Sequence, residues 1–469
     1  MEPVTLDKIV SLAKRRGFVF PSSEIYGGFA ATYDFGPLGF LLKKNIEKAW
    51  RYWNVESRDD MVEIEGAIFM HPKVWEASGH VGGFADLLVE DLVTHKRYRA
   101  DYLIEEAKIV DNAGALSPEE ADAIIKKNNI KSPEGNALST PKKFNLLVKT
   151  HLGPVEDETS VAYLKGESCQ NIYVDYKSVQ ETMRLKLPFG IAQIGKAFRN
   201  EITVKSFLFR TREFEQMDIQ YFCRPEDADK FYEEWKKNRW DFYTKFMGFD
   251  AKNVRWRQHE PDERAFYAKD AWDVEFNFSD MGFKEIEGVH HRGSYDLDQH
   301  SKFSGQDLSY FDQATGARFN PFIIECSGGF NRLFLAALFE FYREEGGRKF
   351  LAFPARLAPY KAAVFPLLAN KPALVEKARG IYETLRKKFM VAWDDRGNVG
   401  KRYYSQDEIG TPYCITVDFD TLGDGSTGSP QETAKLKNTV TIRDRDTATQ
   451  VRKPISELAD FLHENVYGR

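Results

Sequence analysis

The chain has 469 residues, 42% of them hydrophobic and 29% charged, and a formal net charge of −5 at pH 7. This length predicts about two to four domains with sizeable cores, and the composition argues against a disordered or polycationic protein. We recognise no secretory leader and no apolar run long enough to span a bilayer, so we expect a cytoplasmic protein that binds no membrane.

The first clear element follows Gly36-Pro37, which predicts a turn that opens a helix, because proline is tolerated in the first helical turn. Apolar residues then recur at helical spacing, at Leu38, Leu42, Ile46, Ala49 and Trp53. One face of this helix should pack in a core. The aromatic residues Trp50 and Trp53 are also compatible with a contact between subunits.

The middle of the chain begins with a segment of different composition, about residues 88–160, rich in Lys, Asn, Glu and Pro. We interpret it as an insertion that carries a short helix near 118–127. Beyond it, aromatic and β-branched residues predict strands at 189–198, 207–222, 272–278 and 322–325. Helices are expected at 227–246 and, after a turn at Ser327-Gly328-Gly329, in the apolar segment from Leu333 to Phe339.

A break near residues 353–359 separates a last segment with alternating strand and helix patterns. Strands are predicted at 362–368, 390–393, 413–419 and 439–442, helices at 374–389 and 454–465, and a surface loop at 422–430. From residue 354 on, 18 Lys and Arg stand against 15 Asp and Glu. This mildly basic segment is compatible with a nucleic-acid partner, but an ordinary solvated surface has a similar balance.

The clearest chemical pattern is the run from Phe198 to Glu201. On a strand, Arg199 and Glu201 would project from one face. An arginine can donate two hydrogen bonds to a phosphate and stays charged, while a glutamate can accept from an exocyclic amine. Phe214 could stack on a base. An ordinary ion pair between strands would use the same residue types.

A second pattern runs from Glu325 to Arg332, with an apolar strand, two glycines and an arginine in the first turn of an apolar helix. Glycines let a ligand approach the backbone closely. Arg332 would then reach back over the turn, although a surface arginine after a plain turn is the alternative. Together the two patterns are compatible with a site for a phosphate and a base, although each residue also has an ordinary structural explanation.

Three of these segments resemble the signature motifs of class II aminoacyl-tRNA synthetases: the helix after Gly36-Pro37, the run that ends at Glu201, and the segment from Gly329 to Arg332. Longer stretches are similar to homodimeric glycyl-tRNA synthetases, at 20–28, 33–39, 190–201, 212–218 and 407–413. The resemblance covers nearly the whole chain, with the insertion as its weakest part.

The resemblance implies an α+β fold in which a catalytic domain, residues 1–353, carries an antiparallel sheet flanked by helices. A mixed α/β anticodon-binding domain, residues 354–469, would follow it. The implied partners are tRNA(Gly), ATP, glycine and a second copy of the chain.

For ATP, the resemblance places Arg199 on the α-phosphate, Glu201 on the adenine amino group, and Phe214 and Arg332 on the two faces of the base. The remaining residues that it implies for ATP are Asn200, Phe209, Arg210, Thr211, Arg212, Glu213, Glu285, Ile286 and Gly329, with Arg210 near the β- and γ-phosphates. Glu285 would bind magnesium, which prefers carboxylate and phosphate oxygens.

Zinc is not expected. The insertion lacks the paired cysteines of some relatives, and the four cysteines of the chain, Cys169, Cys223, Cys326 and Cys414, lie far apart with no C-x-x-C pair. This spacing also offers no disulfide framework, so we expect reduced and mostly buried thiols.

Glycine presents an ammonium, a carboxylate and no side chain, so a selective site needs acidic groups and close walls that exclude larger substrates. The resemblance implies Glu167, Asp218, Glu325 and Ser327 around the amino group and the α-carbon. It further implies Arg99, Phe214, Glu215, Gln216, Met217, Arg292 and Gly329. Two positions depart from the family: Lys165-Gly166 replaces Arg-Pro, which would make that loop more mobile, and Asp218 replaces glutamate.

The implied reaction is attack of the glycine carboxylate on the α-phosphorus of ATP, followed by transfer from glycyl-adenylate to the 3′-terminal adenosine of tRNA. His290 and His291 are candidates for a general base, although the adenylate phosphate can take the proton. Arg402, Tyr403 and Tyr404 are candidates for contacts with unpaired bases. The alternatives are a synthetase for another small amino acid, such as serine or alanine, and a non-catalytic subunit that binds nucleic acid.

Overall fold

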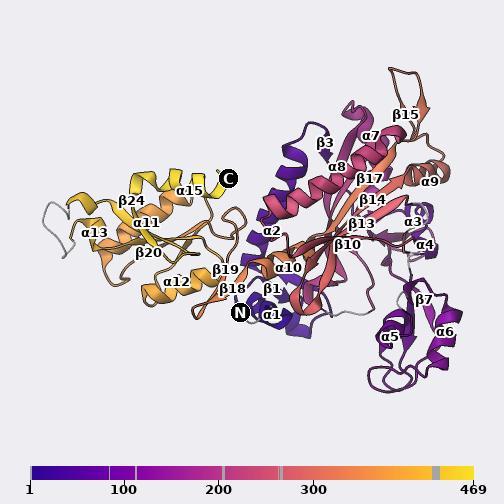
Figure 1. The fold of residues 1–469 in the computed structure, drawn as a ribbon, viewed down its shortest axis with the longest axis horizontal. Helices are drawn as coiled ribbons and strands as arrows, with labels where there is room; N and C mark the ends of the chain where they lie inside the picture. The colour runs from indigo at the N-terminus through magenta and orange to yellow at the C-terminus, as the bar shows by residue number, and fades with distance from the viewer. Residues whose placement is uncertain are drawn as a thin grey trace.

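The computed structural model describes residues 3–83, 85–110, 113–202, 206–261, 263–264, 268–424 and 434–468. A seven-stranded sheet forms the centre of the larger part, in the order β12-β13-β14-β17-β11-β10-β3 (Figure 1). All neighbours are antiparallel except β10 and β3. The strands are β3 (Met61–Glu63), β10 (Phe189–Phe198), β11 (Glu213–Cys223), β12 (Val254–Gln258), β13 (Asp270–Asn277), β14 (Phe283–Gly293) and β17 (Phe322–Gly329).

Four helices pack in the main core with this sheet: α1 (Leu6–Arg15), α2 (Pro37–Arg51), α8 (Ala228–Asp241) and α10 (Phe330–Phe341). Helix α10 is apolar on nearly all sides, as expected of a helix that is buried all round. Two further helices, α7 (Cys169–Thr182) and α9 (Tyr295–Ser304), contribute to a second core. That core lies across the sheet, because it contains Phe222 and Ile323 whereas the main core contains their strand neighbours Tyr221 and Ile324.

The predicted helix after Gly36-Pro37 is confirmed, and a π-helical turn, Tyr52–Glu56, extends it. Trp50 is fully buried within the chain. Trp53 packs on Phe246 and donates to Asn238 at 3.3 Å. Trp50 therefore belongs to the chain's own core and does not form a subunit contact, whereas Trp53 is only partly buried, and a subunit contact there stays a prediction.

The insertion folds as a small separate lobe below the sheet in Figure 1. It contains strands β5 (Ala85–Glu90), β6 (Arg97–Arg99) and β7 (Lys142–Asn145) and helices α5 (Ala100–Glu106) and α6 (Pro118–Lys127), around a core of its own. Helix α6 begins where Ser117 and Glu120 form a reciprocal capping box. The lobe thus starts at residue 85, slightly earlier than the composition indicated, and β8 (Lys149–His151) and β9 (Val161–Leu164) already pair with β4 (Phe69–Met70) outside it.

The C-terminal part has a five-stranded mixed sheet, in the order β21-β20-β22-β23-β24. Its elements are β20 (Ala362–Pro366), α11 (Pro372–Leu385), β21 (Val391–Trp393), α12 (Val399–Glu408), β22 (Tyr413–Val417), α13 (Phe419–Leu422), β23 (Thr439–Asp444), β24 (Gln450–Pro454) and α15 (Leu458–Tyr467). Helix α12 and strand β24 were not predicted. Residues 425–430 of the expected surface loop lie outside the described residues.

The division into domains at residue 353 remains a proposal. Leu357 and Ala358 still pack in the main core, whereas Ala362 opens the C-terminal core. Between them, the buried Lys361 ammonium donates to the carbonyl oxygens of Ala355, Arg356 and Ala358 at 3.1, 2.7 and 2.8 Å. These bonds hold the connection in one conformation.

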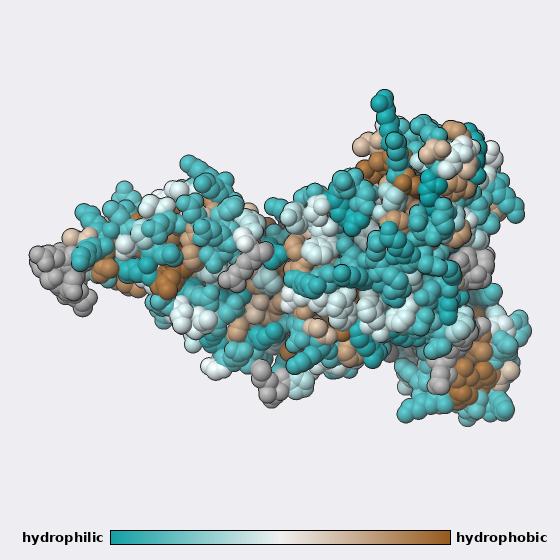
Figure 2. Space-filling model, turned by 45° about the horizontal axis from the view of Figure 1, so that its top comes forward, coloured by the Kyte–Doolittle hydropathy of each residue, from teal (hydrophilic) through white to brown (hydrophobic). Residues whose placement is uncertain are grey.

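The remaining short elements are β1 (Val19–Pro21), β2 (Tyr33–Phe35), α3 (Pro72–Ala77), α4 (His80–Gly83), β15 (Tyr310–Phe311), β16 (Arg318–Phe319), β18 (Tyr342–Glu345) and β19 (Arg348–Leu351). Among the described residues, no helix has the length and apolar character needed to cross a membrane. The face drawn in Figure 2 is mostly hydrophilic, with an apolar patch on the insertion lobe at the lower right.

A buried ion pair links α8 to the sheet. Both side chains are fully buried, with Arg239 Nε 2.9 Å from Glu287 Oε1. Because an unpaired buried carboxylate is costly, we expect Arg239→Met to lower the free energy of unfolding by about 3–5 kcal/mol. Urea denaturation monitored by near-UV circular dichroism measures the change.

The matched control is Lys245→Ala, which removes an exposed ion pair with Asp241 at 2.8 Å. Surface pairs contribute less than about 1 kcal/mol, so this variant should stay near the wild type. Equal losses of stability in the two variants would contradict the role given to the buried pair.

Candidate active site

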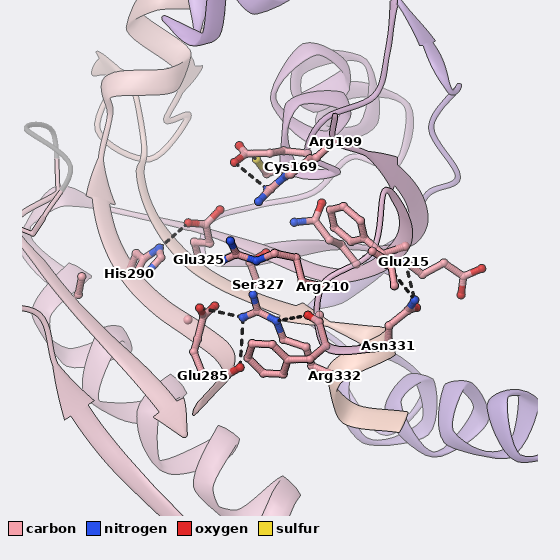
Figure 3. A pocket seen from close by; sticks show the side chains of 18 of the residues that line it. Cys169, Arg199, Arg210, Glu215, Glu285, His290, Glu325, Ser327, Asn331 and Arg332 are labelled. Carbon is pink, nitrogen blue, oxygen red and sulfur yellow. Dashed lines mark hydrogen bonds and ion pairs between the residues drawn. The ribbon is translucent and has the colours of Figure 1, made fainter. Parts of the chain in front are cut away.

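A cavity of about 380 Å³ lies against β11, β13, β14 and β17 (Figure 3). The alternation of side chains on β11 explains its polar lining, since neighbouring residues point to opposite faces of the sheet. Met217 and Ile219 belong to the main core, whereas Phe214 and Gln216 line the cavity. Sheet alternation therefore gives one strand both an apolar core face and a polar cavity face.

Strand β14 uses a bulge to keep its polar residues on the cavity face. Its pairing with β13 runs from Glu275 opposite Glu285 directly to Val274 opposite Glu287, so Ile286 is the extra residue. Ile286 enters the main core, while Glu285 lines the cavity. A bulge shifts the alternation of side chains along a strand by one residue. Without it, Glu285 and the later cavity residues of β14 would point to opposite faces of the sheet.

Arg199 and Glu201 both line the cavity, but not by the predicted alternation. Strand β10 ends at Phe198, and the Glu201 amide donates to the Arg199 carbonyl at 2.7 Å, which marks a tight turn. The Arg199 guanidinium stands 5.3 Å from the centre of the Phe214 ring. The prediction of a shared strand face was therefore wrong, although the turn still delivers both residues to one cavity.

Arg332 lies in the first turn of α10, as predicted, and reaches back over the sheet (Figure 3). The expected glycine turn before it is absent, because β17 continues to Gly329 and α10 begins at once. Arg332 Nη1 lies 2.9 Å from Glu285 Oε2 and its guanidinium lies 4.6 Å from the Phe209 ring centre. Although burial acts the other way, Arg332 lowers the pKa of Glu285.

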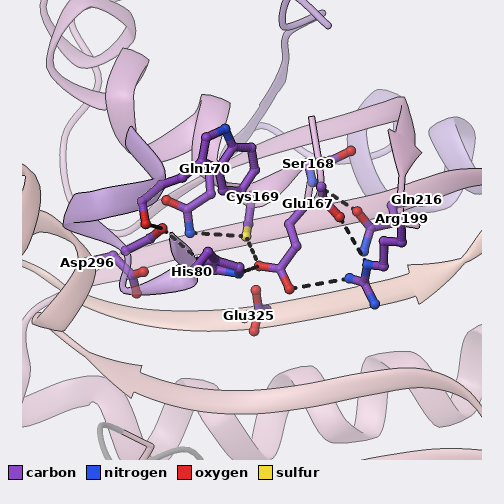
Figure 4. Close-up of polar contacts among 12 residues, drawn as sticks. His80, Glu167, Ser168, Cys169, Gln170, Arg199, Gln216, Asp296 and Glu325 are labelled. Carbon is purple, nitrogen blue, oxygen red and sulfur yellow. Dashed lines mark hydrogen bonds and ion pairs between the residues drawn. The ribbon is translucent and has the colours of Figure 1, made fainter. Parts of the chain in front are cut away.

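Glu167 lies just before helix α7 and joins two sides of the cavity (Figure 4). His80 Nε2 lies 3.0 Å from one of its oxygens, and Arg199 Nη2 lies 3.3 Å from the other. Burial alone would raise the pKa of Glu167, but His80 and Arg199 together hold it well below its usual range. The carboxylate is thus ionised beside the arginine expected to hold the α-phosphate.

Glu325 on β17 is the most densely bonded carboxylate of the site. It accepts from Arg292 at 2.9 Å, from Gln220 at 3.0 Å and bonds His290 Nδ1 at 2.8 Å. Burial opposes ionisation, but Arg292 and His290 lower the pKa of Glu325 to about 2. Arg292 in turn is held by two bonds to Asp296, at 2.8 and 2.9 Å. This network is rigid and charge-compensated.

Asp218 differs from the other acids of the site. Its carboxylate is buried, and neither oxygen has a well-formed hydrogen bond. Burial and the neighbouring Glu325 raise the pKa of Asp218 to about 8, partly offset by the Ser327 hydroxyl and the Lys165 ammonium. At neutral pH this side chain is therefore mostly protonated and poised to ionise when a cation approaches.

The loop before α7 is closely packed around the departures from the family pattern. Lys165 is buried and donates to the Gly66 carbonyl at 3.2 Å and to Gln193 at 3.4 Å. A side chain at Gly166 would bring its Cβ within 2.7 Å of Leu147. Because residue 166 has no side chain, Leu147 can pack directly against the loop.

Most of the residues implied by the resemblance meet in the cavity. Those that line it are Glu167, Arg199, Glu201, Phe209, Arg210, Thr211, Phe214, Glu215, Gln216, Glu285, Arg292, Glu325, Ser327, Gly329 and Arg332. Asn200, Arg212, Glu213, Ile286, Arg99, Met217 and Asp218 are not among the lining residues.

The reasons differ. Met217 and Ile286 face the main core, so the implied contacts with glycine and ATP do not fit their direction. Asn200 is exposed. Arg212 donates to the Glu201 carbonyl at 3.3 Å, and Glu213 pairs with Lys196.

Arg99 belongs to the insertion rather than to the cavity. It pairs with Asp86 at 2.9 Å and with Asp101. Its guanidinium lies 4.3 Å from the Tyr102 ring centre, and Arg210 lies 5.3 Å from the same ring. Tyr102 therefore lies between Arg99 and Arg210 and links the insertion lobe to the cavity.

The two histidines that were candidates for a general base lie on opposite sides of the sheet. His290 lines the cavity, whereas His291 is buried on the other side of the sheet against Tyr232 and Phe322. His291 therefore does not reach the cavity. The residues that sequence reasoning missed are His80, Asn331, His259 and Asp296. Asn331 stands inside the motif that ends at Arg332, whereas the other three stand in no recognisable motif.

The raised pKa of Asp218 leads to a stability prediction. Between about pH 4, the pKa of an unfolded aspartate, and about pH 8, the folded state holds the extra proton. This contribution to stability is complete below that window and is lost as the pH rises through it. We expect Asp218→Asn to remove the loss, so that its thermal midpoint exceeds that of the wild type increasingly toward about pH 9. Parallel profiles of the two proteins would contradict the assignment.

The family model for the class II tRNA synthetase core domain (G, H, P, S and T) matches residues 154–342, and that for the anticodon binding domain matches 361–465. The chain is 45% identical over 474 residues to the glycine–tRNA ligase of Treponema denticola, covering 99% of this chain and 97% of the relative. The corresponding enzyme of Streptomyces coelicolor is 44% identical over 476 residues, covering 99% of each chain.

A third relative gives the same result. The glycine–tRNA ligase of Clostridium acetobutylicum is 45% identical over 474 residues, covering 98% of this chain and 99% of the relative. Near full-length identity of this order, together with both domain matches, decides the family. The chain belongs to the glycine–tRNA ligases, a family of class II aminoacyl-tRNA synthetases.

Proposed function

We propose that this cavity activates glycine with ATP and passes the glycyl group to tRNA(Gly), releasing pyrophosphate and AMP. The observation that carries the proposal is the convergence of three arginines and three acids on one cavity. Arg199, Arg210 and Arg332 gather on one side, each paired with a carboxylate at 3.3, 3.8 and 2.9 Å. Guanidinium groups suit a polyphosphate, since they donate in a planar fork and stay charged.

ATP would lie with its adenine between Phe214 and Arg332 and its α-phosphate on Arg199, as in the family. Glu285 fits a magnesium ion, because its side chain is 46% exposed and Arg332 pairs with its carboxylate through Oε2. The ion would neutralise charge on the β- and γ-phosphates, since magnesium favours a carboxylate combined with phosphate oxygens.

Glycine would bind beside the Glu325 network. Glu325 is paired with Arg292 and Glu167 with Arg199, so Asp218 is the acid left for the substrate ammonium. Ser327, opposite Asp218 in the sheet, lines the cavity. Since Asp218 lies behind that lining, a water or a small shift would complete its contact with the ammonium.

The chemistry needs no protein nucleophile. The glycine carboxylate attacks the α-phosphorus while arginines hold the phosphate, so positioning and charge stabilisation carry the rate. In the second step the tRNA 3′-hydroxyl attacks the glycyl carbonyl, and the adenylate phosphate takes its proton. His290 remains the alternative base, because its Nδ1 is bonded to Glu325 and its Nε2 stays available to accept a proton.

We place the anticodon on the C-terminal part of the chain. There Arg402 is not available to RNA, since it is buried and donates to the carbonyl oxygens of Pro366, Arg396 and Gly397. Tyr403 is tied to Thr416 at 2.6 Å. Tyr404, with 55% of its surface exposed, is the candidate that could still stack on a base.

A homodimer and a cytoplasmic location complete the proposal. Exposed apolar side chains gather in sequence at Ile25, Tyr26 and Phe29, with exposures of 88%, 87% and 70%. Such a segment suits burial against a second copy. The cytoplasm is where a tRNA and ATP would be supplied together.

Arg199 gives the direct test of the adenylation step. Removing a group that stabilises developing charge costs about 10²–10³ in rate, so we expect Arg199→Ala to reduce glycine-dependent ATP–pyrophosphate exchange by that factor. Lys196→Ala is the matched control, because Lys196 lies near the end of β10, just before Arg199, but pairs with Glu213 outside the cavity. Exchange that Arg199→Ala leaves at the wild-type rate would overturn the proposed role.

The amino-acid specificity has a separate test. Exchange assayed with a panel of amino acids should proceed with glycine and be weak with alanine and serine, because larger substrates are excluded by the walls of the site. Exchange with serine but not with glycine would favour the alternative synthetase. Absence of exchange with every amino acid, in a folded protein, would favour a non-catalytic subunit.

A further inference from the structure

Two histidines and an aspartate meet in the wall of the cavity, outside the groups assigned to glycine and ATP. His259 follows β12, Asp273 lies on β13 and His290 lies on β14. One ligand atom from each lies within 4.8 Å of the other two. We propose that these three residues form a binding site for a divalent transition-metal ion.

The sheet positions the three side chains. Asp273 stands opposite Gly288, and His290 follows two residues later on the same face. The Cβ of any residue other than glycine at 288 would stand 2.8 Å from His290 Nε2 and 3.6 Å from Asp273 Oδ1. Glycine therefore keeps open the space that faces both donors.

The protein also orients the donors. His290 Nδ1 is bonded to Glu325 at 2.8 Å, which leaves Nε2 as the donor nitrogen. A carboxylate bonded to the second nitrogen of a histidine is the usual support of a metal-bound imidazole. His259 Nε2 lies 2.8 Å from Asp273 Oδ2, so a bound ion would replace the proton that these two atoms share.

The donor set selects the kind of ion. Two imidazoles and one carboxylate suit zinc, cobalt or iron(II), whereas magnesium favours oxygen donors alone. Donors that each stand about 2.1 Å from one ion lie at most about 4.2 Å apart, so a small rotation of the side chains closes the cluster. Three protein donors leave a further position for water or substrate.

The site has a defined place in the cavity. Through His290, a bound ion would hold Glu325, the carboxylate that organises the amino-acid end of the site. The ion would thus fix the amino-acid end of the site in position. It would be separate from any magnesium that Glu285 holds with ATP.

Titration of the full-length protein with Co²⁺, without nucleotide, tests the proposal, because visible absorption reports the coordination of the ion. Isothermal titration with Zn²⁺ gives the stoichiometry. We expect one ion per chain and release of a proton on binding. His259→Ala and Asp273→Asn should each weaken binding by at least about tenfold.

Two controls separate this site from others. His95→Ala, which alters a histidine with 76% of its side chain exposed in the insertion lobe, should bind as the wild type does. Glu285→Gln should also retain the ion, whereas an ion held by Glu285 would be lost. Circular dichroism confirms that the variants fold.

Binding that both His259→Ala and Asp273→Asn leave unchanged would overturn the proposal, as would the absence of Co²⁺ and Zn²⁺ binding to the wild type. Loss of binding in Glu285→Gln but not in His259→Ala would move the ion to Glu285. None of these outcomes depends on aminoacylation activity.

Discussion

The register between β11 and β17 is the constraint on which the rest of the site depends. Asp218 stands opposite Ser327 and Gln220 stands opposite Glu325. Because side chains alternate across a sheet, this pairing puts the polar residues on one face and Met217 with its apolar neighbours on the other. A slip of one residue would carry carboxylates into the main core and apolar residues into the cavity. The packing of helices α8 and α10 therefore secures the site as well as the fold.

Charge compensation is the second condition. On the core face Glu287 is buried with Arg239, and on the cavity face Glu325 is buried with Arg292. Breaking such pairs is costly, since an unpaired charge in a low dielectric is poorly solvated. Asp218 is the exception, as burial keeps it mostly neutral at pH 7. A cationic substrate group would stabilise the ionised form of this carboxyl. The electrostatics of the site therefore fit an amino acid as substrate.

Long periodic segments and the motif-bearing residues could be predicted from the sequence. The helix after Gly36-Pro37 has a clear apolar repeat. The motifs identified Arg199 and Arg332, which both line the cavity. The bulge at Ile286 could not be predicted, because the local sequence does not fix the register in which β14 pairs with β13. The role of His80 could not be recognised from the sequence either, because its contact with Glu167 joins segments far apart in the chain. Local pattern shows which residues are available, but tertiary packing decides which of them meet.

Glycine and ATP are proposed to meet over β11, β14 and β17. A structure of the protein with a non-hydrolysable glycyl-adenylate analogue is the decisive test. We expect adenine between Phe214 and Arg332, the phosphate mimic on Arg199, and the ammonium within hydrogen-bond reach of Asp218, directly or through one water. An analogue bound elsewhere, or with its ammonium directed away from Asp218 and Ser327, would refute this placement.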